Sequence, residues 1–229
     1  MTHQPNTPLT REAIMSGKIH ELIKGHDVPF ELLSDQDRTA SLEAMFNDGP
    51  IKEDVWLFAY GSLIWNPAIH FAEQRCVTIH GYHRRFCFEV HLGRGSPEAP
   101  GLMLGLDRGG SCRGVAFRIE AERAREELDV VWRREMVSPA YSPKWLRALD
   151  GGTPIRALGF VVNRAHDRYV GDMDEARAAA LISKASGFLG PCADYLRQTS
   201  RHLTELGIPD SGLSRLEALV NEELRKETV

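Results

Sequence analysis

The hydrophobic and polar positions divide the chain into a helical start, a β-rich middle and a helical end. Before residue 53, two segments carry apolar residues at helical spacing, over about 10–25 and 34–46. Thr10 is a suitable N-cap for the first segment, and the turn sequence over 47–50 ends the second. This pattern predicts a helical extension over 1–53 that packs on a main domain over 54–229.

The middle of the chain contains short apolar or alternating runs that predict strands. These runs are residues 55–60, 85–90, 102–106, 114–119 and 157–162. The first is continuously apolar, which is typical of a strand buried on both faces. The glycine-containing segment 108–111 separates the third run from the fourth, so these two runs are predicted to form a hairpin that turns there.

Further segments with apolar residues at helical spacing lie between and after these strands. The predicted helices cover 121–134, 173–186, 193–206 and a last segment that Ser211 can cap. Strands that cluster before helices predict an α+β fold, with a barrel or curled sheet and packed helices.

Composition and charge narrow the class of protein. The 229 residues are 42% hydrophobic and 26% charged with a net charge of −4, which is typical of a globular protein and favours neither nucleic acid nor an anionic membrane. The basic clusters at 83–85 and 133–134 are typical of a solvated surface. No apolar run approaches the ~20 residues of a membrane span, and residues 1–8 carry no secretory signal. The four cysteines lack metal-ligand spacing, so a reducing cytoplasm is predicted.

The first candidate for chemistry is the end of the apolar strand, where Tyr60 is followed by Gly61, Ser62 and Leu63. A glycine at this point lets the backbone turn sharply and approach a ligand closely. Successive N–H groups in such a turn can hold an anion or a polarised carbonyl. The alternative is a plain strand-ending turn in which Tyr60 belongs to the core.

The second candidate is Glu135. Ala124, Leu128 and Val131 form an apolar stripe on the predicted helix, and Glu135 is the next residue on that stripe, whereas its neighbours Arg133 and Arg134 point elsewhere. A carboxyl group among apolar side chains should have a raised pKa, as proton transfer near neutral pH requires. The alternative is a frayed helix end that leaves Glu135 in solvent or paired with an arginine.

Other residues suggest weaker hypotheses. The loop over 93–101 could act as a lid or contact an anion through Arg94, or be a plain flexible loop. His80 and His83 have no evident third partner for a metal, and no cysteine has a local signature of activation. Ser62 is not within a nucleophile-elbow motif, although a catalytic triad stays open.

Three segments together resemble the ChaC family, the glutathione-specific γ-glutamylcyclotransferases. They are Phe58-Ala59-Tyr60-Gly61-Ser62-Leu63-Ile64-Trp65-Asn66-Pro67, Trp132-Arg133-Arg134-Glu135-Met136, and Ser186-Gly187-Phe188-Leu189-Gly190 leading to Asp194-Tyr195-Leu196. The resemblance covers about 54–206. The chain departs from the family pattern at Ala59, where glycine is usual, and at Phe188 and Cys192, where proline and asparagine are usual.

The resemblance implies a small mixed β-barrel flanked by helices, with glutathione as substrate and neither metal nor cofactor. It makes Glu135 the general acid/base. It implies that the γ-glutamyl group is held by Leu57, Phe58, Ala59, Tyr60, Gly61, Ser62 and Leu63. Arg94 or Tyr141 would contact the distal part of the substrate.

Competing functions stay open at this point. A cyclotransferase could act on other γ-glutamyl amino acids or amines. A binding module without catalysis could regulate a transport system, although a pure binder needs no half-buried proton carrier. A serine hydrolase is a third hypothesis, and the oligomeric state is open.

Overall fold

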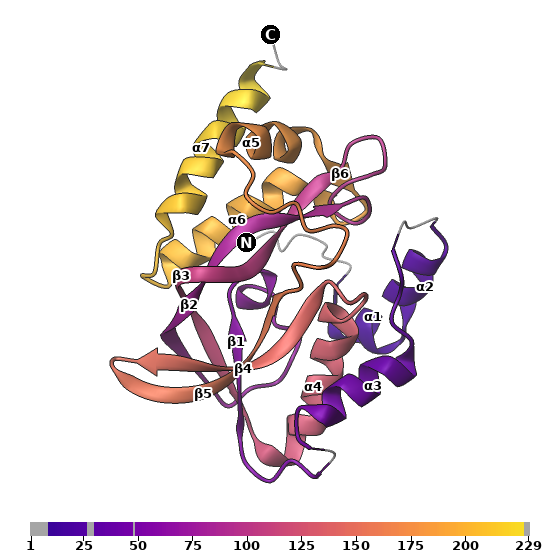
Figure 1. Cartoon of the computed structure of the whole chain (residues 1–229), viewed down its shortest axis with the longest axis vertical. Coiled ribbons are helices and arrows are strands. Elements are labelled where there is room, and N and C mark those ends of the chain that lie inside the picture. Colours follow the sequence, from indigo (N-terminus) through magenta and orange to yellow (C-terminus); the bar gives the residue numbers. More distant parts are fainter. Residues whose placement is uncertain (1–8, 27–29, 48, 227–229) are drawn as a thin grey trace, which may run out of the picture.

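Five strands close into a barrel within the described residues, 9–26, 30–47 and 49–226, of the computed structural model (Figure 1). In chain order they are β1 (Val55–Ala59), β2 (Glu73–Val90), β3 (Gly101–Ile119), β4 (Tyr141–Asp150) and β5 (Thr153–Val162). Around the barrel the order is β1-β3-β2-β4-β5, and β1 closes it by pairing in parallel with β5. All other pairs are antiparallel, so the predicted α+β fold with a mixed barrel is confirmed.

The helices lie on two sides of this barrel (Figure 1). The first group comprises α1 (Arg11–Met15), α2 (Lys18–Lys24), α3 (Asp35–Ala44) and α4 (Ala121–Glu135). The second comprises α5 (Glu175–Lys184), α6 (Cys192–Glu205) and α7 (Ser211–Lys226), with the short strands β6 (Ser186–Gly187) and β7 (Gly190–Pro191) between α5 and α6. A single 3-10 turn, η1 (Ser62–Ile64), follows β1.

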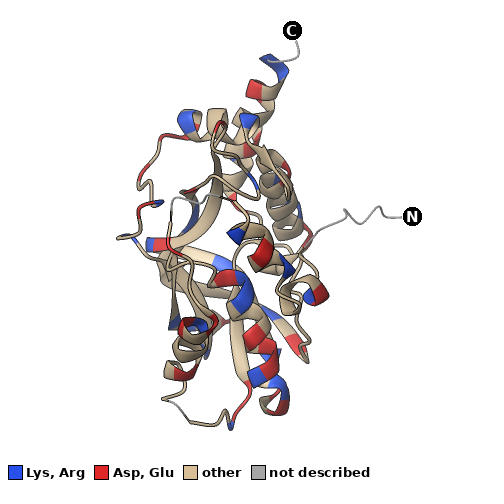
Figure 2. Ribbon diagram, turned by 90° about the vertical axis from the view of Figure 1, so that its right-hand side faces the viewer, with Lys and Arg blue, Asp and Glu red and all other residues tan. Residues whose placement is uncertain are grey.

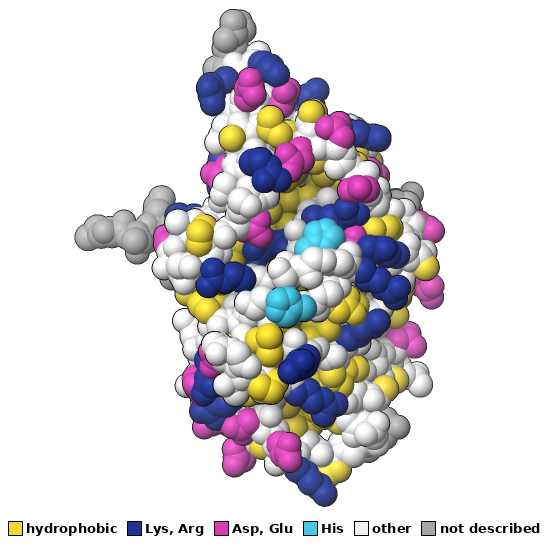
Figure 3. All heavy atoms as spheres, turned by 60° about the vertical axis from the view of Figure 1, so that its left-hand side comes forward, with side chains coloured by type: hydrophobic (Ala, Val, Ile, Leu, Met, Phe, Trp, Pro, Cys, Tyr) yellow, Lys and Arg dark blue, Asp and Glu magenta, His cyan; other side chains and the backbone are white. Residues whose placement is uncertain are grey.

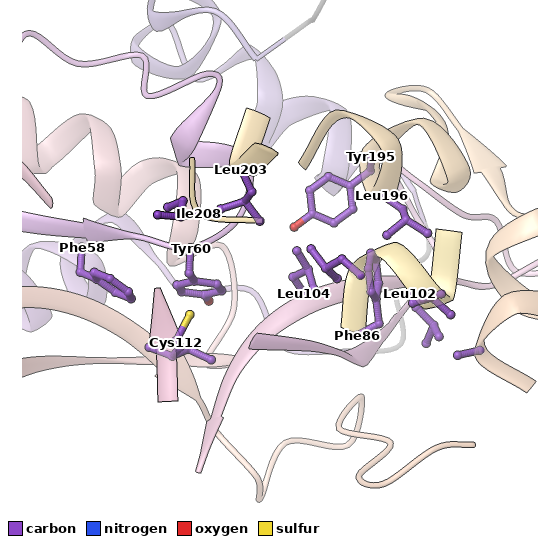
Figure 4. Packing of buried hydrophobic residues seen from close by; sticks show 14 of the residues in the cluster. Phe58, Tyr60, Phe86, Leu102, Leu104, Cys112, Tyr195, Leu196, Leu203 and Ile208 are labelled. Atoms are coloured by element: carbon purple, nitrogen blue, oxygen red, sulfur yellow. The ribbon is translucent and has the colours of Figure 1, made fainter. Parts of the chain in front are cut away.

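Strand β1 is buried on both faces, as its apolar run predicts. Leu57 and Ala59 belong to a core cluster that includes α4. Phe58 and Tyr60, which point the other way, belong to a cluster shared with α5, α6 and α7 (Figure 4). The two halves of the molecule therefore meet at β1, and the residues just after β1 lie at their junction.

The predicted hairpin over 102–119 is wrong, because β3 runs unbroken through its glycines. Gly109 and Gly110 adopt positive φ angles of 102° and 65°, but the chain continues along β2 instead of turning back. A register shift between His80 and Tyr82 on β2 lies opposite these glycines, so the pair of strands carries a β-bulge there. The connection between β2 and β3 is the segment 91–100.

Two further details differ from the sequence interpretation. Strand β4 was not predicted, because its sequence includes Pro143 and only Leu146 and Ala148 are buried in it. Ser211 is the first residue of α7, and the cap is the preceding Asp210, whose carboxylate accepts from the N–H groups of Gly212 and Leu213.

The amino-terminal helices are anchored on α4. Glu127, a carboxylate only 1% exposed, pairs with Arg11 of α1 and also accepts from the N–H of His70 at 3.0 Å. Trp132 donates to the Ser41 hydroxyl of α3 at 3.3 Å. The extension therefore packs on the barrel through α4, while a domain boundary at residue 53 stays a prediction.

Residues of opposite charge are mixed on the outer helices and do not form separate acidic and basic patches there. Figure 2 shows acidic and basic residues interspersed along the outer helices. On the face shown in Figure 3, Lys and Arg side chains lie among uncharged and hydrophobic ones. Among the helices that the structure describes, none has the length and hydropathy to cross a membrane.

We expect Arg11→Met to lower the free energy of unfolding by about 2 kcal/mol, because it leaves the buried Glu127 carboxylate without its cation. Glu126→Gln is the matched control, since Glu126 pairs with the same arginine at 2.6 Å but is 67% exposed. That change should cost at most about 0.5 kcal/mol. Urea unfolding measures both, and equal losses would show that burial of Glu127 is not what makes the contact stabilising.

Candidate active site

A small inner cavity lies where the turn after β1 faces the end of α4. Its lining comes from the turn after β1 and from η1, from β3, β4, β5 and α6, and from the last residue of α4. The lining residues are Tyr60, Gly61, Ser62, Leu63, Met103, Leu104, Glu135, Tyr141, Phe160 and Tyr195. The turn and Glu135, the two strongest candidates in the sequence, therefore share one cavity, and Tyr141 joins them.

A larger outer cavity of about 160 Å³ opens from the same place. Ser62, Met103, Glu135 and Tyr141 line both cavities, so the two adjoin. The outer cavity is walled on one side by the amino-terminal extension and on the other by loops that follow β2, β5 and β6. These walls include Leu9, Ile19, Ile23, Phe30, Leu92, Arg168, Phe188 and Leu189.

The turn after β1 is held by contacts from α6 and β2. A Cβ atom on Gly61 would lie 3.0 Å from the Tyr195 hydroxyl, so any larger residue would require the tyrosine to shift. Arg84, on β2, donates from Nε to the Tyr60 carbonyl at 2.6 Å. Figure 4 shows Tyr195 reaching from α6 over Leu104, with its hydroxyl on the Tyr60 side.

Glu135 lies at the end of the apolar stripe that the sequence predicts. Ala124, Leu128 and Val131 are fully buried on α4, and the Glu135 side chain is 17% exposed. Burial raises the pKa of its carboxyl group, while the charge of Arg134, 3.2 Å away, opposes that rise. The net direction is upward, which suits a group that exchanges protons near neutral pH.

The prediction that Arg134 points away from Glu135 is wrong, whereas Arg133 does point elsewhere and pairs with Asp129 at 2.8 Å. The Arg134 side chain is only 4% exposed. Besides Glu135, it donates to the Ser62 hydroxyl at 2.8 Å and to the Asn66 carbonyl. Helical spacing does not predict this contact, because the long Arg134 side chain reaches its neighbour Glu135 as well as Ser62 and Asn66, which lie far away in the sequence.

The interpretation of both basic clusters as solvated surface is also wrong for one arginine in each, Arg84 and Arg134. Arg84, like Arg134, is buried, and its side chain is 2% exposed. It donates to the carbonyls of Tyr60 and Arg113 and pairs with Asp210 at 2.8 Å. Buried arginines with this many partners are structural anchors of the site.

Tyr60, Tyr141 and Tyr195 surround the carboxylate as neutral hydroxyls. Burial is the main cause that raises the pKa of each of the three phenols, and the negative charge of Glu135 adds to it in all three. Tyr141 donates to the Leu104 carbonyl at 2.8 Å. The site therefore combines one exchangeable carboxyl group with polar hydroxyls that keep their protons.

Four of the residues predicted to bind substrate do not line either cavity. Leu57, Phe58 and Ala59 are completely buried in the barrel core. Arg94 donates to the Pro191 carbonyl at 3.2 Å and lies 6.0 Å from the centre of the Tyr195 ring. Their direct contact with a substrate stays a prediction, and this geometry does not support it.

The departures from the family pattern have simple structural consequences. The methyl group of Ala59 packs in the core and does not narrow the cavity. Phe188 is on the rim of the outer cavity. Cys192 is buried, its thiol donates to the Leu102 carbonyl at 3.0 Å, and burial raises its pKa to about 11, which leaves it a poor nucleophile.

Sequence reasoning missed Tyr195 as a member of the site. It lies in the segment 194–196 that carries part of the family resemblance, so that resemblance was the available signal. No group of three or more His, Cys, Asp or Glu side chains is placed to hold a metal in the part of the chain that the structure describes.

The fold and the site define a γ-glutamylcyclotransferase-like protein. The structure is similar to the crystal structure of a yeast γ-glutamyl cyclotransferase specific to glutathione, with a TM-score of 0.69, 20% sequence identity, and coverage of 75% of this chain and 97% of that one. At this identity the similarity establishes the fold. It agrees with the barrel and helices that the family resemblance implies.

The chain belongs to the ChaC-like protein family, whose model matches residues 55–223. It is 41% identical over 186 residues to the glutathione-specific γ-glutamylcyclotransferase of Escherichia coli K12, covering 81% of this chain and 80% of the relative. It is 30% identical over 191 residues to the human glutathione-specific γ-glutamylcyclotransferase 1, covering 81% and 85%. These matches confirm the resemblance found in the sequence motifs.

We expect the Glu135 carboxyl to titrate above the ordinary range of glutamate, and Arg134→Gln to raise its pKa further, because the opposing positive charge is lost. Arg133→Gln is the matched control and should leave the titration unchanged, since Arg133 pairs with Asp129. Carbon-13 NMR of labelled glutamate side chains measures all three. Equal shifts in the two variants would contradict the assigned pairing.

Proposed function

We propose that the chain is a glutathione-specific γ-glutamylcyclotransferase that releases 5-oxoproline and cysteinylglycine. The observation that carries the proposal is the meeting of Glu135 with the turn over Tyr60–Leu63 in one small cavity. The glutathione-specific names of the relatives in Escherichia coli and human support the choice of substrate. The four cysteines, all unpaired, are compatible with a cytoplasmic enzyme.

The reaction is an intramolecular aminolysis. The α-amine nitrogen of the γ-glutamyl group attacks the γ-carbonyl carbon and forms the five-membered ring, and the bond from that carbon to the cysteinyl nitrogen breaks. Starting from the ammonium form, two protons leave the attacking nitrogen, one before the attack and one as the ring closes, and two reach the departing nitrogen, which leaves as an ammonium group, so the reaction is balanced without water, metal or oxidant. Because the nucleophile is tethered, correct folding of the substrate can supply ~7–11 kcal/mol of the barrier.

Glu135 is the group that moves these protons. The α-amine is protonated at neutral pH and becomes nucleophilic only when a base accepts its proton. Glu135 would accept it and then donate a proton to the leaving nitrogen, and its raised pKa makes both transfers accessible. Arg134, which lies beside it, keeps part of the population ionised and therefore able to act as a base.

The turn after β1 is suited to stabilise the negative charge that develops on the substrate. Negative charge develops on the γ-carbonyl oxygen as the amine attacks, and N–H groups of a rigid turn stabilise such an oxyanion. Arg84 and Arg134 fix this turn through the Tyr60 carbonyl and the Ser62 hydroxyl. The Tyr195 hydroxyl, which stands against Gly61, is a further donor at the same place.

The first experiment is incubation of the purified protein with glutathione, without metal or nucleotide. We expect 5-oxoproline and cysteinylglycine to appear in equal amounts. Parallel assays with γ-glutamyl-alanine test breadth, and faster turnover of that dipeptide would replace glutathione as the substrate. Binding of glutathione with no product from a folded protein would favour a binding module and contradict the enzyme.

Glu135→Gln should fold normally and reduce kcat by ~100- to 10,000-fold, because the proton acceptor is removed while the shape is kept. Glu122→Gln, in the first turn of the same helix, is the control and should retain full activity. Product release by coupled assay and thermal melting measure both variants. Substantial turnover by a folded Glu135→Gln protein would exclude the acid/base role.

A further inference from the structure

Arg168 is a cation on the wall of the outer cavity that has no carboxylate partner among the described residues. Its one side-chain hydrogen bond there is from Nη2 to the Ser138 hydroxyl, at 2.7 Å. Its Nε atom is buried without a partner within the same residues. A buried donor left open in this way is unusual and calls for an explanation.

The other arginines near the site do not share this property. Arg134 also lines the outer cavity, but its donors are engaged by Glu135, Ser62 and Asn66. Arg94 does not line the cavity and bonds a backbone carbonyl. Of the two arginines that line this cavity, Arg134 is paired with a carboxylate and Arg168 is not, within the described residues.

The position of Arg168 is fixed by its surroundings. Its carbonyl accepts from the Glu89 N–H of β2 at 2.9 Å, which ties the loop after β5 to the barrel. The guanidinium carbon lies 3.9 Å from the centre of the Phe30 ring, so the extension supports one side of the group. Burial lowers the pKa of Arg168, but an arginine keeps its charge at neutral pH.

We propose that Arg168 binds the glycyl carboxylate of glutathione and thereby selects the tripeptide over shorter γ-glutamyl compounds. A guanidinium with open donors fits a carboxylate, which can accept two parallel hydrogen bonds from it. This inference rests on the proposed function, because it assumes that the γ-glutamyl group occupies the inner cavity.

The direction of the substrate follows from the order of groups along the two cavities. Tyr141 and Glu135 line both cavities, whereas Arg168 lines only the outer one. A γ-glutamyl group that reacts beside Glu135 therefore sends the rest of the peptide past Tyr141 toward Arg168. The intervening walls are mostly apolar and can hold the cysteinyl side chain; they include Ile19, Ile23, Val90, Leu92 and Leu189.

The test compares glutathione with glutathione amide, in which the glycyl carboxylate is neutral, on the wild type and on Arg168→Gln. For the wild type we expect kcat/KM to be ~10- to 100-fold lower with the amide. Arg168→Gln should lose a similar factor with glutathione, mainly through KM, and should lose little with the amide. Arg168→Lys should recover part of the loss, because it keeps the charge without the planar pair of donors.

A matched control is Arg201→Gln, which removes an exposed arginine paired with Glu205 and should change neither substrate. Equal losses with both substrates in Arg168→Gln would overturn the proposal, since the residue would then act on the γ-glutamyl end or on the fold. Unchanged kinetics with glutathione would overturn it as well.

Calorimetric binding separates this proposal from the proposed function. Glutathione should bind the Glu135→Gln protein ~10-fold or more tightly than it binds the Glu135→Gln/Arg168→Gln protein, while glutathione amide should bind both alike. If the wild type proved inactive, this comparison would still decide whether Arg168 recognises the carboxylate. Equal affinities of glutathione for the two proteins would refute it.

Discussion

The site depends on the contact between Arg134 and Glu135 at the end of α4. Burial alone would hold the carboxyl group protonated, whereas a strong ion pair alone would hold it ionised. With Arg134 at 3.2 Å, both effects act on one group, and the pKa stays raised. Because Arg134 also donates to Ser62 and Asn66, the side chain that moderates the charge of Glu135 fixes the turn opposite it. Protonation and geometry are therefore set by the same residue.

A second buried arginine extends this arrangement to the carboxy-terminal helices. Arg84 joins the Tyr60 carbonyl to Asp210, and Asp210 in turn caps the first turn of α7. Tyr195 of α6 reaches the same turn across Gly61. Segments that are far apart in the sequence thus meet at the residues after β1, and a disturbance of the α6–α7 pair should reach the inner cavity through Tyr195 and Arg84.

The sequence allowed prediction of those features that depend on local periodicity. The apolar run of β1 and the stripe that ends at Glu135 needed only neighbours along the chain, and both are present in the structure. The continuous β3, the burial of Arg84 and Arg134, and the place of Tyr195 each depend on a partner many residues away. Arg94 is a case in which a local pattern misleads. An arginine in a glycine-rich loop suggests an anion contact, but in the structure Arg94 donates to a backbone carbonyl.

The amino-terminal extension gives the outer cavity an apolar wall that the barrel does not supply. The family match begins at residue 55, but Leu9, Ile19, Ile23 and Phe30 form part of the outer wall. The pair between Arg11 and the buried Glu127 fixes α1 on α4 and so keeps this wall in place. Apolar side chains at the mouth displace water, which strengthens the interaction of any charge bound there. Glu135, whose pKa burial raises, and Arg168 line the same cavity, so exclusion of water by the extension would strengthen both the acid/base chemistry and the carboxylate contact that we propose.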